Sequence, residues 1–187
     1  MHQPLRIIAN RFKDTRGWFS ESYSQRRLLE LGIDANFVQD NHSYSAARGT
    51  LRGLHFQSPP NEQAKLVRCV SGKIWDVAVD LRKYSMTYGK WVAAELTAAG
   101  GEQLYIPAGF GHGFLTLTED TEVVYKSSNY YSPECEGGVA WNDSDIAIEW
   151  PLCGRDPVMS EKDRSLPRLC DLASPFPYGG LPLVPFD

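Results

Sequence analysis

Two histidines lie in apolar, strand-like segments: His55 in LRGLHFQ and His112 in IPAGFGHGF. An imidazole among apolar residues must find hydrogen-bond partners or lose stability. Because its ordinary pKa is near neutrality, the same group is also a common acid or base in enzymes. Taken alone, each histidine is more simply explained as a core residue with satisfied hydrogen bonds. A catalytic role therefore has to be argued from the residues around them.

The segment at 107–112 reads PAGFGH, a P-x-G-x-x-H pattern. It resembles the second motif of the cupin jelly rolls, in which a turn delivers a histidine into the mouth of the barrel. Metal-dependent cupins carry H-x-H and then a glutamate in their first motif, whereas this chain has His55-Phe56-Gln57. His55 and His112 alone, without a clear third ligand, are too few for a tight transition-metal site. We expect no metal and no cofactor, and chemistry carried out by acids and bases.

Lys65 and Tyr125 are polar residues in phase with apolar neighbours. Lys65 alternates with Val67 and Cys69, and Tyr125 alternates with Val123. On periodicity alone, both side chains either point into a barrel or lie at its ends and reach water.

Arg52 and His55 are three residues apart, so they would face opposite sides of a regular strand. Gly53 lies between them and could hold a β-bulge that turns one of the two side chains around. Without such a bulge, Arg52 cannot join His55 in one pocket.

Residues 50–127 have the sequence pattern of the β-strands that would position these side chains. Short alternating segments are separated by Gly, Pro and charged turns, as in an all-β sandwich or barrel. In KIWDVAVDLR, Trp75, Val77, Val79 and Leu81 share one phase, and Asp76 and Asp80 occupy the other. A helix is expected over 24–32, ended by Gly32, and a short capped turn over 160–163. The other expected strands are AKLVRCV, GKWVAAELT, EQLYIP, GFLTLT and TEVVYKSS.

The 187 residues fit one domain, which we expect to cover 1–173, followed by a Pro/Gly-rich tail at 174–187 that is extended, docked or disordered. A net charge of -4 argues against binding to nucleic acid. No apolar run approaches the ~20 residues of a membrane span, and no secretory signal is evident. The four cysteines are scattered, which is typical of reduced thiols. We therefore expect a cytoplasmic protein without nucleic-acid or membrane partners.

Several longer motifs together resemble the dTDP-4-dehydrorhamnose 3,5-epimerase family. The similarity covers about residues 5 to 170 in continuous order, through DTRGWFSES, FVQDNHSYSAARGTLRGLHFQ, QAKLVRCVSGKIWDVAVDLR, IPAGFGHGF, VVYKSSNYYSPECEG, VAWNDSDIAIEWP and MSEKD. The resemblance implies an all-β, cupin-like jelly-roll barrel (a double-stranded β-helix) with a few short helices. It also implies a metal-free homodimer that acts on a dTDP-sugar.

The resemblance assigns roles to particular residues. It implies that His55 is the catalytic base, Tyr125 the catalytic acid, and Asp163 the carboxylate that orients the histidine. By itself, Asp163 reads more simply as half of a capping box with Ser160. Tyr131 matches a residue that stacks on thymine, although its NYY segment could equally be a strand end with exposed aromatics. The implied substrate contacts are Arg16, Glu21, Gln39, Asp40, Asn41, Arg52, Lys65, His112, Tyr131, Glu136 and Lys162.

The implied reaction converts dTDP-4-dehydro-6-deoxy-D-glucose to dTDP-4-dehydro-β-L-rhamnose. A ketone at C4 acidifies the protons on C3 and C5, and the enolate needs a cation such as Lys65 or Arg52. Three other interpretations stay open: an epimerase acting at a single carbon, a metal-dependent cupin enzyme, and a sugar-nucleotide-binding module without catalysis.

Overall fold

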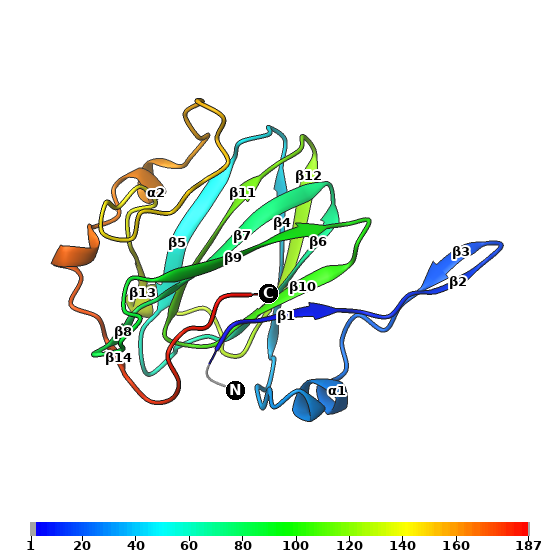
Figure 1. Ribbon diagram of the computed structural model, residues 1–187, viewed down its shortest axis with the longest axis horizontal. Helices are drawn as coiled ribbons and strands as arrows, with labels where there is room; N and C mark the ends of the chain where they lie inside the picture. Colours follow the sequence, from blue (N-terminus) through cyan, green and yellow to red (C-terminus); the bar gives the residue numbers. More distant parts are fainter. Residues whose placement is uncertain (1–2, 187) are drawn as a thin grey trace.

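The computed structural model describes residues 3–186 and consists mainly of two five-stranded antiparallel sheets (Figure 1). One sheet has the order β1-β10-β6-β12-β4, and we call it the cavity sheet. Its strands are β1 (Leu5–Ile8), β10 (Glu102–Ile106), β6 (Lys65–Ser71), β12 (Thr121–Ser127) and β4 (Gln39–Ser45).

The second sheet, which we call the histidine sheet, has the order β13-β5-β11-β7-β9. Its strands are β13 (Glu136–Gly138), β5 (Leu51–Gln57), β11 (Phe110–Thr116), β7 (Lys73–Asp80) and β9 (Trp91–Thr97). Two small pairs complete the β structure: β2 (Phe12–Asp14) with β3 (Gly17–Phe19), and β14 (Phe176–Pro177) with β8 (Arg82–Lys83).

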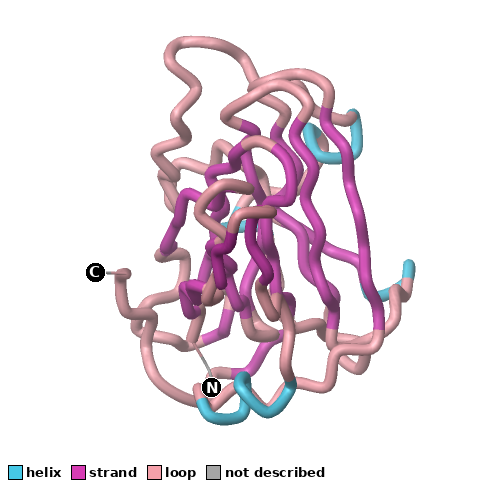
Figure 2. Tube along the Cα trace, turned by 90° about the vertical axis from the view of Figure 1, so that its right-hand side faces the viewer, coloured by secondary structure: helices cyan, strands magenta, loops and turns pink. Residues whose placement is uncertain are grey.

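Helical structure is sparse and peripheral, as Figure 2 shows. It comprises α1 (Gln25–Glu30), α2 (Glu161–Arg164) and the 3-10 turns η1 (Pro133–Cys135) and η2 (Leu169–Asp171). No helix within residues 3–186 has the length and apolar character needed to cross a membrane.

Successive long strands change sheets along the chain. From β4 the path runs to β5 in the other sheet, back to β6, across to β7 and β9, then to β10, β11 and β12 in alternation. This winding is that of a jelly roll, and it confirms the predicted all-β, cupin-like fold.

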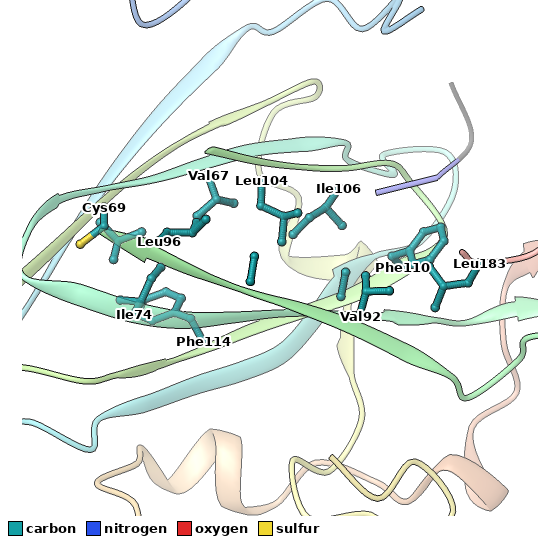
Figure 3. Close-up of a cluster of buried hydrophobic side chains, with 13 residues drawn as sticks. Val67, Cys69, Ile74, Val92, Leu96, Leu104, Ile106, Phe110, Phe114 and Leu183 are labelled. Carbon is teal, nitrogen blue, oxygen red and sulfur yellow. The ribbon is translucent and has the colours of Figure 1, made fainter. Parts of the chain in front are cut away.

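A continuous apolar core fills the space between the two sheets (Figure 3). Val67 from the cavity sheet and Ile74 and Phe114 from the histidine sheet belong to it. The outer face of the histidine sheet is also buried, because Val77 and Val79 pack with Val139 and other residues that follow the barrel in sequence. Strand β7 is therefore buried on both faces, which explains why each of its two phases is rich in apolar residues.

The predicted strands between residues 50 and 127 are all present, and so are the helix before Gly32 and the capped turn. Ser160 Oγ accepts a hydrogen bond from the Asp163 amide at 3.1 Å. The segment QDNHSYS, whose polar composition is typical of a loop, is instead strand β4. Its polar residues alternate between the barrel interior and solvent, so hydrophobicity does not mark it as a strand.

The tail is docked on the barrel over its described part, up to residue 186. Phe176 is buried against the outer face of the histidine sheet. Leu183 enters the main core, and its amide donates a hydrogen bond to Thr87 Oγ1 at 2.8 Å. The boundary expected at residue 173 stays a prediction.

Leu183 should therefore contribute to the stability of the whole barrel. We expect Leu183→Ala to lower the free energy of unfolding by about 2 kcal/mol, because a core leucine, only 8% exposed, is lost. Leu181→Ala is the matched control: this side chain is 65% exposed, and its loss should change stability by about 0.5 kcal/mol or less. Urea denaturation measures both, and equal effects would show that the tail is not part of the core.

Candidate active site

A cavity of about 300 Å³ opens between the two sheets. It lies where β4 and β6 begin and where β5 and β12 end. Most of its lining atoms belong to polar residues, in contrast to the apolar core deeper in the barrel. The lining residues are Gln39, Asn41, His55, Phe56, Gln57, Gln63, Lys65, Tyr125, Tyr131 and Glu136.

On the wall formed by the histidine sheet, His55 is held by a carboxylate. Its Nε2 lies 2.8 Å from Asp163 Oδ1, and Asp163 Oδ2 accepts the Gly53 amide at 3.2 Å. Burial raises the pKa of Asp163, but hydrogen bonds from His55, Gly53 and Ser160 outweigh it, so the pKa lies below its usual value. The carboxylate thus stays ionised and accepts a hydrogen bond from the Nε2–H group, which leaves Nδ1 as the ring nitrogen available to accept a proton.

Of the two alternatives left open at Gly53, the structure has the β-bulge. His112 pairs with His55 and Phe114 pairs with Arg52, so two residues of β5 oppose one of β11. Because paired residues of an antiparallel ladder share a face, Arg52 and His55 both point to the barrel interior. Arg52 itself is outside the set of lining residues; it donates to the Tyr44 carbonyl at 3.0 Å and to Ser45 Oγ at 3.3 Å.

Tyr125 and Lys65 stand on the opposite wall, in the cavity sheet, and both point inward. The Lys65 ammonium is 6.0 Å from the centre of the Tyr125 ring. Burial raises the pKa of the Tyr125 phenol, so the phenol keeps its proton at neutral pH. Burial lowers the pKa of Lys65 to about 8, against the opposing effect of two carboxylates.

The rim of the cavity carries a polar cluster. Glu136 Oε2 accepts hydrogen bonds from the Tyr131 hydroxyl at 2.9 Å and from Lys162 Nζ at 2.6 Å. The pKa of Glu136 is lowered: burial opposes this, but the two hydrogen bonds prevail. Gln39 Oε1 accepts the Tyr131 amide at 3.1 Å and joins this cluster to β4.

His112 lies deeper, beside the cavity rather than on its lining. Its Nε2 is 2.6 Å from Asp76 Oδ1, and both residues are buried. Burial lowers the pKa of His112, although Asp76 acts in the opposite direction. Asp76 was not among the predicted site residues, but its phase in β7, opposite to that of Val77 and Val79, already marked it as facing the other side of the strand.

Three residues that were predicted to contact the substrate do not lie at the cavity of their own chain. Asp40 points to the outer face of its sheet and forms an ion pair with Lys126 at 2.9 Å, because it alternates with Gln39 and Asn41. Glu21 lies in a separate hollow beside β1 and α1. Arg16 is at the tip of the β2–β3 hairpin, which projects away from the barrel (Figure 1), and forms an ion pair with Asp14.

Two lining glutamines were missed by the sequence analysis. Gln57 follows His55 by two residues in β5, and this spacing was the available signal. Its Oε1 accepts the Ser132 amide at 2.7 Å, and its Nε2 donates to the Tyr130 carbonyl at 3.1 Å. Gln63 lies in a loop, where no periodicity marks it. Among residues 3–186, no group of three or more His, Cys, Asp or Glu side chains is placed to hold a metal ion.

A jelly roll that holds a histidine–carboxylate pair across one cavity from a tyrosine and a lysine belongs to the class of cupin-like acid–base enzymes. The sequence model of the family described as dTDP-4-dehydrorhamnose 3,5-epimerase matches residues 2–171. The chain therefore belongs to the dTDP-4-dehydrorhamnose 3,5-epimerase family.

Individual relatives agree with this assignment. A dTDP-4-dehydrorhamnose 3,5-epimerase of Salmonella typhimurium is 54% identical over 159 residues, which is 84% of this chain and 86% of that protein. The crystal structure of an epimerase from Legionella pneumophila in complex with dTDP-4-keto-L-rhamnose is 41% identical, with a TM-score of 0.89 over 95% of this chain and 94% of that chain. A 3'-monoepimerase from Streptomyces bikiniensis in complex with dTDP-quinovose is 34% identical, with a TM-score of 0.82 over 89% and 84% of the two chains.

The bulge at Gly53 should tolerate no side chain. Gly53 has a φ of +127°, and an added Cβ would lie 2.6 Å from Gly113 Cα and 2.8 Å from the His112 carbonyl oxygen. We expect Gly53→Ala to lower the free energy of unfolding by about 3 kcal/mol, from backbone strain and overpacking together.

The control is Gly154→Ala, because Gly154 also has a positive φ, of +76°, but open space around it. Backbone strain alone should cost about 1 kcal/mol there. Chemical denaturation of the two variants gives the comparison, and equal losses would contradict the close approach of β5 and β11.

Proposed function

We propose that this chain converts dTDP-4-dehydro-6-deoxy-D-glucose to dTDP-4-dehydro-β-L-rhamnose by inverting the carbons on both sides of the C4 ketone. The observation that carries the proposal is the position of His55 with Asp163 on one wall of the cavity and of Tyr125 on the opposite wall. The sugar seen in the Legionella pneumophila relative is the product of this reaction.

Each inversion begins with proton removal. Nδ1 of His55 takes the proton from C3 or C5, and the electron pair of the broken C–H bond moves to the ketone oxygen to form an enolate. The Asp163 carboxylate stabilises the imidazolium that results, as an orienting carboxylate does in other histidine bases. The Lys65 ammonium, with Arg52 further out, stabilises the enolate oxygen, where charge develops only in the transition state.

Tyr125 completes the inversion from the other side of the ring. Its phenol gives a proton to the same carbon while the enolate returns to the ketone, so the configuration changes. The raised pKa of Tyr125 keeps this phenol protonated before the reaction. Solvent then returns a proton to the phenolate and takes one from the imidazolium, and the residues are ready for the second carbon.

The rim cluster fits the nucleotide end of the substrate. Tyr131 is exposed and presents an aromatic face for the thymine ring. Lys162 provides a positive charge for the pyrophosphate. Gln39, Asn41 and His112 complete the predicted contacts from within the barrel, and Glu136 orients Tyr131 and Lys162.

We propose that the site is completed in a homodimer. The β2–β3 hairpin exposes Phe12, Trp18 and Phe19, which is unusual for three large apolar side chains on a strand pair that leaves the barrel. Docked on a second copy, the hairpin would bury these residues and carry Arg16 to the partner's cavity. Glu21 and Asp40 would act near the same contact, outside their own chain's cavity.

The state of the cysteines bears on the cellular compartment. Cys69, Cys135, Cys153 and Cys170 are all free thiols, which persist in a reducing compartment. We therefore propose a cytoplasmic enzyme that works without cofactor and without nucleic-acid or membrane partners.

Removal of the phenol should separate catalysis from binding. We expect Tyr125→Phe to lower turnover by at least ~100-fold with dTDP binding retained, because only the proton donor is lost. The assay is turnover of dTDP-4-dehydro-6-deoxy-D-glucose with a coupled reductase, with dTDP binding followed by calorimetry. Tyr130→Phe is the control, because Tyr130 is 66% exposed and its side chain is not on the cavity lining, so its turnover should stay near wild type.

His55→Ala should behave like Tyr125→Phe in both measurements. If turnover survives in either variant, the acid–base assignment is wrong, and loss of dTDP binding in both would indicate a binding role instead.

A single-carbon epimerase is the second candidate, because the Streptomyces bikiniensis monoepimerase shares the fold. Reaction in D₂O distinguishes the two. Deuterium at both C3 and C5 of the product, seen by NMR, is the expected result. Label at only one carbon would contradict double inversion.

Complementation between variants tests the trans role of Arg16. We expect Arg16→Ala and His55→Ala to be inactive alone and to regain about a quarter of wild-type activity after mixing and subunit exchange, because one site of each heterodimer is intact. Sedimentation should give a dimer for each variant. A monomeric wild-type protein would contradict the dimer, and a dimer without recovery would contradict the trans role.

A further inference from the structure

A buried carboxylate beneath the cavity has a free oxygen. Asp76 in β7 is fully buried, and its Oδ1 forms a hydrogen bond of 2.6 Å with Nε2 of His112. Its Oδ2 has no hydrogen-bond partner among the described residues. An ionised oxygen left without a partner in a dry interior is costly, so an attraction from elsewhere must offset the cost.

The other two carboxylates near the base and acid are already engaged. Glu136 is bound by Lys162, and Asp163 is bound by His55. Asp76, in contrast, has only His112 as a hydrogen-bond partner among residues 3–186, and burial lowers the pKa of that ring, which favours its neutral form. A negative charge on the Asp76 carboxylate would therefore not be balanced by its hydrogen-bonded neighbour.

Lys65 is the positive counterpart of Asp76. It points inward from the opposite sheet, and no ion pair to its ammonium exists within residues 3–186. Asp76 is the strongest of the negative charges that favour the ammonium form of Lys65, ahead of Glu136. One buried negative charge thus faces one inward-pointing positive charge across the barrel, with neutral His112 bound to the carboxylate.

We propose that Asp76 is a positioning residue for the reaction: its carboxylate, held by His112, is the counter-ion that keeps Lys65 in the ammonium form beside the ketone. The catalytic part of this inference rests on the proposed function, because Lys65 must be charged to stabilise an enolate. The pairing of Asp76 with Lys65 does not rest on the proposed function, because it is a property of the chain without substrate.

Other charged groups around Lys65 leave this task to Asp76. Tyr125 on β12 keeps its proton, and Arg52 on β5 adds only a further positive charge. His55 is bound by Asp163, and Glu136 on β13 is bound at the rim by Lys162. Without Asp76, the remaining carboxylates would be Glu136 and Asp163, which Lys162 and His55 already bind, and the Lys65 amine would release its proton more readily.

Titration of Lys65 in the substrate-free protein tests the pairing directly. NMR of lysine labelled at Cε and Nζ, with the Lys65 signal assigned through Lys65→Met, should give a midpoint of about 8 in the wild type. In Asp76→Asn, which keeps the shape of the side chain, we expect the midpoint to fall by about one pH unit or more. The matched control His112→Gln removes the ring but leaves the carboxylate, and should keep the midpoint near the wild-type value.

An unchanged midpoint in Asp76→Asn would overturn the proposal, and so would an equal fall in His112→Gln. If Asp76→Asn does not fold, the double variant Lys65→Met/Asp76→Asn is expected to fold, because it removes both charges of the pair. If the double variant is as unstable as the single one in urea, the two charges are not coupled and the proposal fails.

Turnover then gives a signature that a merely structural role would not produce. The ammonium form is present below the Lys65 pKa and is lost as pH rises through it, so a lower pKa moves the alkaline limb of the pH profile to lower pH. For Asp76→Asn we expect kcat to fall about 5-fold at pH 8 and little at pH 6. A loss that is uniform across pH would contradict the counter-ion role. If the wild type does not turn over the sugar at all, the proposed function fails, while the NMR titration still decides the pairing.

Discussion

One buried carboxylate holds the site together. One Asp163 carboxylate oxygen accepts a hydrogen bond from the His55 ring, and the other accepts one from the Gly53 amide. The Asp163 amide itself donates a hydrogen bond to Ser160 Oγ. These contacts join α2 to a strand about 110 residues earlier in the chain. Because the amide and the imidazole bind the same carboxylate, the bulge in β5 and the orientation of the base are set together. Only the Ser160 half of the expected capping box is therefore formed, because the Asp163 carboxylate binds His55 and Gly53 instead.

The second constraint is electrostatic and follows from placing charges between two sheets. Each carboxylate near the cavity has its own partner: Asp163 has His55, Glu136 has Lys162, and Asp76 has the neutral ring of His112. Ionised groups in such an interior are stable only when opposite charges offset their desolvation. The same condition favours catalysis, because an enolate that forms in this cavity meets positive charge already in place and needs no rearrangement of solvent.

Sequence reasoning predicted the barrel and its strands because hydrophobic alternation reports directly on burial, as in β9, where Val92, Ala94 and Leu96 are the buried residues. It failed for β4, whose residues alternate between a polar cavity and water, so that neither phase is apolar. The bulge at Gly53 was foreseen as one of two alternatives, but only the register between β5 and β11 decides it. Gln63 and the partnership of Asp76 with His112 depend on contacts between segments far apart in sequence, and no local pattern encodes them. For Arg16, the family resemblance identified a candidate residue but not its position, because Arg16 lies far from its own chain's cavity.

The two faces of the barrel also differ in a way that bears on assembly. The histidine sheet is covered by the segment that follows the barrel, so the strand that carries the base is buried on both sides and its backbone is held firmly. The cavity sheet is covered only in part, by α1 and its neighbours against Leu66 and Tyr105. The hairpin that leaves the barrel from this side exposes aromatic residues and carries Arg16 at its tip. His55 thus needs no residue from outside the chain, whereas Arg16, one of the predicted cations, does not reach its own chain's cavity. The homodimer proposed above would both cover the aromatic residues and complete the charge.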